Sequence, residues 1–431
     1  MEEQEFLLTI GSGGADLHRL VAEELQQLGA AGVERSGQAR FFFRAAVEPT
    51  QRFEALHSPE KLYAIVLRQP TSSLELPAGG EEAEEALAAA IAASDGWPRA
   101  LRTWRLLTRA GGGDGSEPDA GAGALPRSFR ATGKRAGSLM ARLSSNGISE
   151  LVGEAVAAAH GWEVDLKGFD LEVVVHLNDE VLLVLLPLLE RGSSRQSHFA
   201  CPGLTQPVAW AMARSADIAP GEVVLDPMCG SGIILLEAAQ CWRGARYLGF
   251  DVDASQLQRS ASNLGLLSDR VRHAVCLARA SVTQLPLPGG CVDAVVCDLP
   301  FGKLYGSEQE NETLYPAALR ELHRVLRPGT GRAVLLTNQA NADRLAAAFC
   351  AADNGYWTVT CRRRLLLGHM EAVLFLAVAR QDPAPGAPVL PEESMRLPWE
   401  DGRGRAKWGA MKAQVRQPLQ PVLGGRKQLM R

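Results

Sequence analysis

The stretch "VLDPMCGSGIILLEAA" (224–239) joins an apolar run, an acid and two glycines to a helix-like segment. Gly230 and Gly232 stand at G-x-G spacing, where glycine lets a ligand approach the backbone and a following helix offers free N–H groups. A dinucleotide-binding turn would need a third glycine where Leu235 stands, and Asp226 would repel a phosphate. The stretch therefore predicts an α/β fold whose ligand carries an amino-acid-like ammonium group.

Strand-like and helix-like segments alternate through residues 196–382, which predicts a Rossmann-like domain with a parallel sheet covered on both faces. The strand predicted after the glycine turn ends at Asp251, where a carboxylate can accept both hydroxyls of a ribose, and Asp253 is the near alternative. An acid, a G-x-G turn and a second-strand acid form the pattern of S-adenosylmethionine binding. Ser281, in "SVTQLPLP" (281–288), stands where a third acid often lies near the adenine amine.

The stretch "CDLPFGK" (297–303) ends another predicted strand in an acid, a proline-containing turn and an aromatic residue. Asp298 can accept hydrogen bonds from the exocyclic amine of a purine, and the Pro300 turn can aim backbone carbonyls at the same amine. Phe301 offers a ring on which a base stacks. The stretch predicts methyl transfer to a base amine, whereas Lys303 fits a phosphate contact or a solvated side chain equally well.

The first half of the chain has a different composition. Residues 5–70 have the pattern of a small α+β unit, and residues 110–125 are rich in glycine, as in a flexible insert. Residues 126–145 contain basic side chains and no acid, which fits either a solvated face or a patch that binds RNA phosphates. The basic residues of this stretch are Arg127, Arg130, Lys134, Arg135 and Arg142.

The bulk composition is that of a soluble globular protein, with 431 residues, 46% hydrophobic and 22% charged. The net charge of -4 means that any nucleic-acid-binding surface is local. No apolar run has the length of a membrane helix, and the acidic start argues against a secretory or mitochondrial leader. The cysteines form no CxxC pair, which predicts buried free thiols in a reducing compartment and no metal site.

Over most of residues 5–380 the chain resembles the THUMP domain-containing RNA guanine-N2-methyltransferases of eukaryotes. The resemblance rests on "HLND" (176–179), "VAWAMARSADIAPGEVVLDPMCGSGIILLEAA" (208–239), "SVTQLPLP" (281–288) and "LYPAALRELHRVLRPGTGRAVLLT" (314–337). It implies the following order: a ferredoxin-like domain (1–75), a THUMP domain with the glycine-rich insert (76–195), a Rossmann-like methyltransferase domain (196–382) and a Pro-rich, then basic tail (383–431).

The resemblance also implies an activity, which is S-adenosylmethionine-dependent formation of N2-methylguanosine in a small structured RNA, U6 small nuclear RNA or tRNA. The family residues that carry over are Asp226, Gly230, Gly232 and Asp251 for the cofactor, and Asp298, Pro300 and Phe301 for the target base. A small zinc-ribbon activator subunit is the implied partner, and the implied location is intracellular, with the nucleus favoured over the cytoplasm.

Two other functions stay open at this point. Methylation of adenine N6 uses the same amine chemistry. A non-catalytic RNA-binding scaffold with a methyltransferase shell is the second, although such a protein is expected to have lost Asp298 or the G-x-G turn, and both are present.

Overall fold

The computed structural model divides the chain into two compact units. One comprises residues 1–198 with 205–211, and the other comprises residues 199–204 with 212–431. The structure describes residues 3–10, 15–36, 39–46, 56–74, 81–108, 125–137, 145–190, 199, 204–302, 307–351, 356–367 and 370–382. The predicted insert (110–125), except Leu125, and the tail (383–431) therefore lie outside the described residues.

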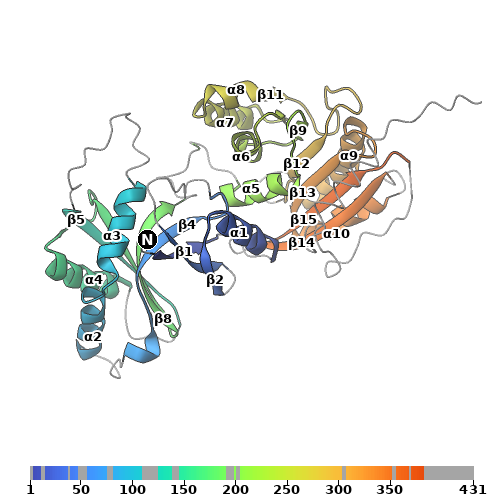
Figure 1. Ribbon diagram of the computed structural model, residues 1–431. Helices are drawn as coiled ribbons and strands as arrows, with labels where there is room; N and C mark the ends of the chain where they lie inside the picture. Colours follow the sequence, from blue (N-terminus) through green and yellow to red (C-terminus); the bar gives the residue numbers. More distant parts are fainter. Residues whose placement is uncertain are drawn as a thin grey trace, which may run out of the picture. The chain divides into compact units, whose positions relative to one another are not determined.

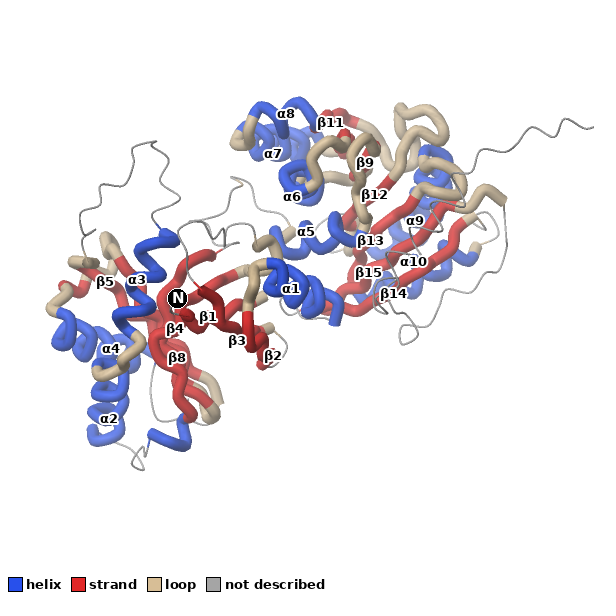
Figure 2. The backbone as a smooth tube through the Cα atoms, viewed as in Figure 1, coloured by secondary structure: helices blue, strands red, loops and turns tan. Residues whose placement is uncertain are grey.

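The first unit is built on an eight-stranded sheet in the order β2-β3-β1-β4-β8-β7-β5-β6 (Figures 1 and 2). Its strands are β1 (Glu3–Thr9), β2 (Ala31–Ser36), β3 (Arg40–Ala46), β4 (Lys61–Pro70), β5 (Ser128–Arg135), β6 (Glu163–Val164), β7 (Leu171–Leu177) and β8 (Val181–Glu190). Its helices are α1 (Ala15–Gln27), α2 (Glu81–Ala92), α3 (Trp97–Thr108) and α4 (Ser145–His160), with a short 3₁₀ turn η2 (Thr71–Leu74).

The strands β4 and β8 make this sheet continuous across the predicted ferredoxin-like and THUMP segments. The two strands pair antiparallel, with Ile65 opposite Leu185. Apolar residues of α1 pack with β1 and β3, and those of α2, α3 and α4 pack with β4, β7 and β8. A separate apolar cluster around Tyr63 and Leu183 lies on the alternate residues of the same strands. The two segments thus share one sheet, and the helices of each segment pack in a separate apolar cluster.

The second unit contains a seven-stranded sheet in the order β11-β10-β9-β12-β13-β15-β14 (Figure 2). Its strands are β9 (Val223–Asp226), β10 (Arg246–Asp251), β11 (Val275–Arg279), β12 (Ala294–Asp298), β13 (Arg332–Asn338), β14 (Trp357–Leu367) and β15 (Met370–Ala379). Its helices are α6 (Ile233–Cys241), α7 (Ala254–Gly265), α8 (Asp269–Ala274), α9 (Glu308–Val325) and α10 (Gln339–Cys350), and α5 (Gln206–Ser215) spans the division between the units.

The pairing in this sheet corrects the expectation of a purely parallel arrangement. The strands from β9 to β13 run parallel to their neighbours, but β15 runs antiparallel to both β13 and β14. The final hairpin explains the difference, because a short connection between β14 and β15 permits only an antiparallel pair.

The strand order also locates the expected binding edge. From β9 the chain adds β10 and β11 on one side and then returns to place β12 on the other side of β9. Ligands of open α/β sheets bind at the carboxyl ends of the strands where the order reverses in this way. Asp226 and Asp298, the last residues of β9 and β12, stand at that reversal.

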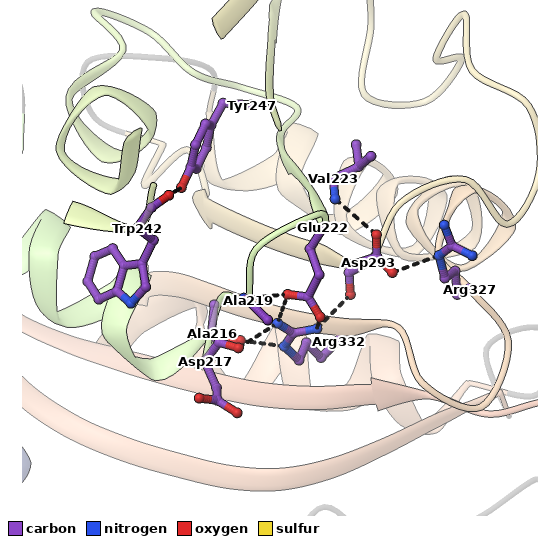
Figure 3. Close-up of polar contacts among 10 residues, drawn as sticks. All are labelled: Ala216, Asp217, Ala219, Glu222, Val223, Trp242, Tyr247, Asp293, Arg327 and Arg332. Carbon is purple, nitrogen blue, oxygen red and sulfur yellow. Dashed lines mark hydrogen bonds and ion pairs between the residues drawn. The ribbon is translucent and has the colours of Figure 1, made fainter. Parts of the chain in front are cut away.

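The opposite end of this sheet is fixed by a buried arginine at the start of β13 (Figure 3). Arg332 is 5% exposed, and its Nη1 and Nη2 lie 3.3 and 2.6 Å from the two carboxylate oxygens of Glu222. Its Nε also donates to the carbonyl of Ala216, and Nη2 donates to that of Asp217 at 2.9 Å. The guanidinium therefore joins the end of α5, the start of β9 and the start of β13.

Two expectations about the surface have different outcomes. Among the described residues, no helix is long and apolar enough to cross a membrane. The described cysteines are free thiols, but Cys276 and Cys350 are exposed. The prediction that the cysteines are buried is therefore wrong for these two, because an apolar neighbourhood in the sequence does not fix the side of a strand or helix on which a residue falls.

Candidate functional site

The turn after β9 holds both of its glycines in a left-handed conformation. Gly230 has a φ of 52° and Gly232 a φ of 84°. A Cβ at Gly232 would stand 2.2 Å from Ser260 Oγ on α7, whereas at Gly230 the nearest atom, Gln256 Oε1, is 3.9 Å away. The first glycine therefore leaves space in front of the turn, and the second allows α7 to pack closely. Gly232 is the N-cap residue of α6 and contributes no side-chain hydrogen bond to it.

The carboxylate of Asp251 connects the end of β10 to this turn. Its Oδ2 accepts a hydrogen bond from the Gly230 amide at 2.9 Å, and its Oδ1 accepts one from the Asp253 amide at 2.9 Å. A carboxylate has about four acceptor positions, so two remain for a ligand. Asp253 instead caps α7, because its Oδ1 accepts a hydrogen bond from the Ser255 amide at 2.8 Å. Of the two alternatives, Asp251 is the one beside the glycine turn.

Two neighbouring residues complete this side of the edge. Val252, which stands between Asp251 and Asp253, is 57% exposed. Ser281 lies on the loop after β11, which reaches Asp251 through the Ala280 amide and the Asp251 carbonyl at 3.1 Å. The Ser281 hydroxyl lies 2.9 Å from Thr283 Oγ1, so it takes part in its own turn.

The last residues of β9 and β12 are acids in an unusual environment. Burial raises the pKa of Asp226 to about 8, and the nearby charges of Asp298 and Asp251 add to this effect. Hydrogen bonds from the Met228 amide and the Cys297 thiol oppose the shift. Burial alone raises the pKa of Asp298 to about 7. Both shifts mean that this edge of the sheet disfavours two negative charges and would be stabilised by a cation.

Asp298 has one further property. The residue as a whole is half-buried, but its Oδ1 is shielded from solvent and has no hydrogen-bond partner among the residues that the structure describes. A buried polar atom without a partner is destabilising, so its presence at a strand end marks a position for a ligand donor.

The carbonyl of Pro300 is occupied within the protein. It accepts from Asn311 Nδ2 at 2.9 Å and from Tyr315 Oη at 2.8 Å. Because a carbonyl oxygen has two lone pairs, both are used. That carbonyls of this turn face the target amine stays a prediction. Phe301 is half-buried, and Gly302 has a φ of 78°.

Residues 128–135 of the basic stretch form β5, a strand that the sequence analysis did not predict. Arg130 pairs with Glu172 at 2.7 Å and lies 4.4 Å from the centre of the Phe169 ring. Because side chains alternate along a strand, Arg130 and Lys134 share one face and Arg135 lies on the other. Arg127 and Lys134 are exposed, and Arg142 and Lys303 lie outside the described residues. Of the four predicted residues that the structure describes, Arg135 therefore lies on a different face from Arg130 and Lys134.

Comparison with known proteins assigns both units. Residues 117–186 match the THUMP domain, and residues 195–354 match the RMKL-like methyltransferase domain. The chain carries a THUMP domain and an RMKL-like methyltransferase domain. The family resemblance inferred from the sequence is confirmed, as is the predicted fold class of an α+β region followed by a Rossmann-like methyltransferase domain.

Curated relatives match about half of the chain. A human U6 snRNA (guanine-N(2))-methyltransferase, THUMPD2, is 36% identical over 219 residues, which are 50% of this chain and 42% of that protein. A Bos taurus tRNA (guanine(6)-N(2))-methyltransferase, THUMP3, is 37% identical over 227 residues, or 48% and 43% of the two chains. The Thermus thermophilus tRNA (guanine(6)-N2)-methyltransferase is 35% identical over 217 residues, or 49% and 62%. The chain thus spans 42% to 62% of the length of these relatives.

The sequence pattern favoured THUMP domain-containing protein 2, with protein 3 as second choice. Relatives of both names match at nearly equal identity, so identity does not separate them.

Solved structures share the fold along nearly the whole chain. TrmN from Thermus thermophilus superposes with a TM-score of 0.62 at 24% identity and covers 88% of this chain and 100% of its own. SMU.472, a putative methyltransferase complexed with SAH, superposes with a TM-score of 0.64 at 14% identity, with coverages of 89% and 100%. At these identities the likeness concerns the fold of the methyltransferase domain and the region before it.

Proposed function

We propose that this protein is an S-adenosylmethionine-dependent methyltransferase that forms N2-methylguanosine in a small structured RNA. The observation that carries the proposal is the buried Oδ1 of Asp298 at the carboxyl end of β12, which has no hydrogen-bond partner among the described residues. This atom stands where the strand order reverses, next to the strand that leads into the glycine turn. The names of the relatives, which are guanine-N2 methyltransferases of U6 snRNA and tRNA, support the choice of base and of RNA.

The residues at the edge fit the cofactor. Gly230 leaves open space in front of the turn, and Asp251 keeps acceptor positions for the ribose hydroxyls. Asp226 and Asp298 have raised pKa values that a positively charged ligand would lower. When bound, S-adenosylmethionine supplies an electrophilic methyl group on a positively charged sulfur. The protein residues bind and orient it, and beside its positive charge Asp226 and Asp298 are ionised.

The acceptor side has equally simple requirements. Asp298 Oδ1 accepts a hydrogen bond from the exocyclic amine of the guanine, which fixes the nitrogen in line with the methyl group. A carboxylate with a pKa of about 7 is also suited to receive the proton that leaves the nitrogen. Phe301 stacks on the base, an interaction of about 1–3 kcal/mol. The target base reaches this position by leaving its stack in the RNA.

The THUMP region holds the RNA in this proposal. Arg127 and Lys134 are exposed, and Arg130 is paired with Glu172. Arg135 and Arg142 remain part of the proposal from the sequence. The predicted domain order, from a ferredoxin-like domain (1–75) to the basic tail, is the framework that presents these side chains.

Two further parts of the proposal rest on the family resemblance. A small zinc-ribbon activator subunit binds the methyltransferase domain, and the protein acts inside the cell, with the nucleus favoured over the cytoplasm. Purification of the chain with and without a zinc-ribbon activator tests the first part, because only a functional partner raises the rate of methyl transfer.

Nucleoside analysis tests the proposed reaction. The protein is incubated with labelled S-adenosylmethionine and separately with tRNA and U6 snRNA, and each digested RNA is examined by mass spectrometry. N2-methylguanosine in one of the RNAs is the expected result. N6-methyladenosine would overturn the base assignment, and no label in either RNA, with cofactor bound and activator present, would favour the RNA-binding scaffold.

A further inference from the structure

The turn that carries Phe301 is held by side chains that never reach the site. The Pro300 carbonyl accepts from Asn311 and Tyr315, both on α9, at 2.9 and 2.8 Å. The Phe301 carbonyl accepts from Asn338 Nδ2 at 3.2 Å and from Asn341 Nδ2 at 3.0 Å. Two consecutive carbonyls therefore each have two amide or hydroxyl donors, although water could satisfy a carbonyl of an ordinary surface turn.

The direction of one chain of hydrogen bonds follows from chemistry alone. A carbonyl oxygen only accepts, so Tyr315 donates its single proton to Pro300. Thr337 Oγ1, 2.9 Å from Tyr315 Oη, must then donate to the tyrosine oxygen. Burial raises the pKa of Tyr315 to about 12, so the hydroxyl keeps its proton at neutral pH. The chain runs from β13 through α9 to the turn.

Burial separates these residues from any substrate. Asn311, Thr337 and Asn341 are 0% exposed, Tyr315 is 1% exposed and Asn338 is 4% exposed. They can act on a bound base only through the turn, which begins directly after Asp298. In-line methyl transfer depends on the alignment of the reacting atoms, and a displacement of about 1 Å can lower the rate by about 100-fold.

We infer that Tyr315, Asn311, Asn338 and Asn341 are positioning residues for methyl transfer. They lock the turn after β12, so that the carboxylate of Asp298 and the ring of Phe301 are in place before the target base arrives. The inference rests on the proposed function, and it assigns a kinetic role to side chains that the sequence pattern did not single out.

Tyr315→Phe tests the inference, with Tyr247→Phe as the matched control. Tyr247, near the start of β10, is also 1% exposed. Its hydroxyl donates to the backbone carbonyl of Trp242 at 2.6 Å (Figure 3). Each variant keeps its ring and loses one buried hydroxyl. We expect Tyr315→Phe to lower the single-turnover rate by about tenfold to 100-fold, with the cofactor Kd and the RNA KM within about twofold of wild type. Tyr247→Phe keeps the wild-type rate despite a comparable loss in Tm.

A second variant approaches the turn from the other side. Asn338 caps α10 through its Oδ1, which accepts from the Asn341 amide at 3.0 Å, and serine retains such a cap while losing the donor to Phe301. Asn338→Ser should therefore also lower the rate and leave cofactor binding unchanged.

The outcomes separate the inference from the function beneath it. Wild-type rates in both Tyr315→Phe and Asn338→Ser, with an active wild-type protein, would overturn the inference alone. Rate and cofactor affinity that fall together in Tyr315→Phe would show a general structural role and overturn it as well. A wild-type protein that methylates no RNA would overturn the proposed function, and the inference with it.

Discussion

At the scale of single residues, the methyltransferase domain holds carboxyl groups in buried positions that disfavour their charged form. Asp226 is 1% exposed, and Asp298 has a buried oxygen without a partner among the described residues. Buried charges without partners are destabilising, and such groups concentrate at functional sites. The stability lost at this edge is what a cationic ligand and an amine donor would restore on binding.

Asp298→Asn should change how stability depends on pH. Burial raises the pKa of Asp298 from 3.8 to about 7, so between these values the folded protein holds a proton that the unfolded chain has released. The contribution to stability is therefore present at low pH and is lost as pH rises to about 7. When the pH rises from 5 to 8, we expect the free energy of unfolding of the wild type to fall by about 2–3 kcal/mol more than that of the variant.

Urea unfolding of both proteins at the two pH values measures this difference. Identical changes in the two proteins would show that Asp298 ionises normally in the folded state.

Asp251→Ala and Asp253→Ala should separate cofactor binding from helix capping. Asp251 contacts the glycine turn, whereas Asp253 caps α7. We expect Asp251→Ala to weaken S-adenosylmethionine binding by about 1.5–3 kcal/mol, the usual contribution of hydrogen bonds to a charged group. Asp253→Ala should instead cost about 1 kcal/mol of stability with little change in Kd. Isothermal titration calorimetry and urea unfolding provide the two readouts, and the reverse pattern would transfer the ribose contact to Asp253.

At the scale of secondary-structure elements, the glycine turn sets the distance between α6 and α7. Gly232 has both a left-handed backbone and a neighbouring side chain, Ser260, that leaves no room for a Cβ. The same turn leads into the start of α6 at the carboxyl edge of the sheet. Close packing and ligand access thus depend on the same glycine-containing turn.

Gly232→Ala should destabilise the methyltransferase domain by about 2–4 kcal/mol, because it adds a left-handed alanine and a contact with Ser260. Gly265→Ala is the matched control, since a Cβ there meets nothing within 4 Å and the position ends α7. The control should be neutral or slightly stabilising, by up to about 1 kcal/mol. Denaturant unfolding distinguishes the two variants, and equal stabilities would refute the packing argument.

The sequence predicted the elements whose signals are local. Alternating strands and helices with an acid at the strand end sufficed to place Asp226, Asp251 and Asp298 at one sheet edge, because parallel strands share their carboxyl ends. The strand β5 was missed because its basic residues and Gly133 interrupt the apolar alternation. The helix α9 begins at a capping box of Ser307 and Glu310, which is readable in the sequence.

The parts of the site that escaped prediction depend on tertiary contacts. Nothing in the sequence shows that the Pro300 carbonyl meets Asn311 and Tyr315, because residues 11 and 15 positions later can be placed anywhere by the intervening segment. The partner of Asp298, or its lack of one, is likewise a property of the folded domain. Sequence patterns therefore found the acids but not the side chains that hold the turn beside them.

At the scale of the whole molecule, each unit has its own sheet, and the acids of the candidate site lie in the methyltransferase domain. The two ends of its sheet differ in their charged groups. The carboxyl end carries Asp226 and Asp298, whose pKa values are raised by burial, whereas at the amino end Arg332 is bound by Glu222 and by backbone carbonyls (Figure 3).

Arg332→Leu should destabilise the methyltransferase domain by about 3–5 kcal/mol, because it leaves the carboxylate of Glu222 buried without its partner. Replacement of both residues by leucine should restore part of that loss. Arg327→Leu is the control, since Arg327 pairs with Asp293 at 2.7 Å but has a side chain that is 52% exposed (Figure 3). Its loss should cost less than about 1 kcal/mol. Chemical denaturation measures the free energy of unfolding of the three variants. Equal losses of stability in Arg332→Leu and Arg327→Leu would contradict the role given to the buried ion pair.

The central claim is that Asp298 faces the base to be methylated while the glycine turn and Asp251 face the cofactor. The most direct test measures both functions in Asp298→Ala: the Kd for S-adenosylmethionine by calorimetry and the single-turnover rate of N2-methylguanosine formation in RNA. The account predicts a Kd near that of the wild type and a rate lower by a factor of about 100 or more. Loss of cofactor binding together with the rate, or a rate that survives the substitution, would contradict it.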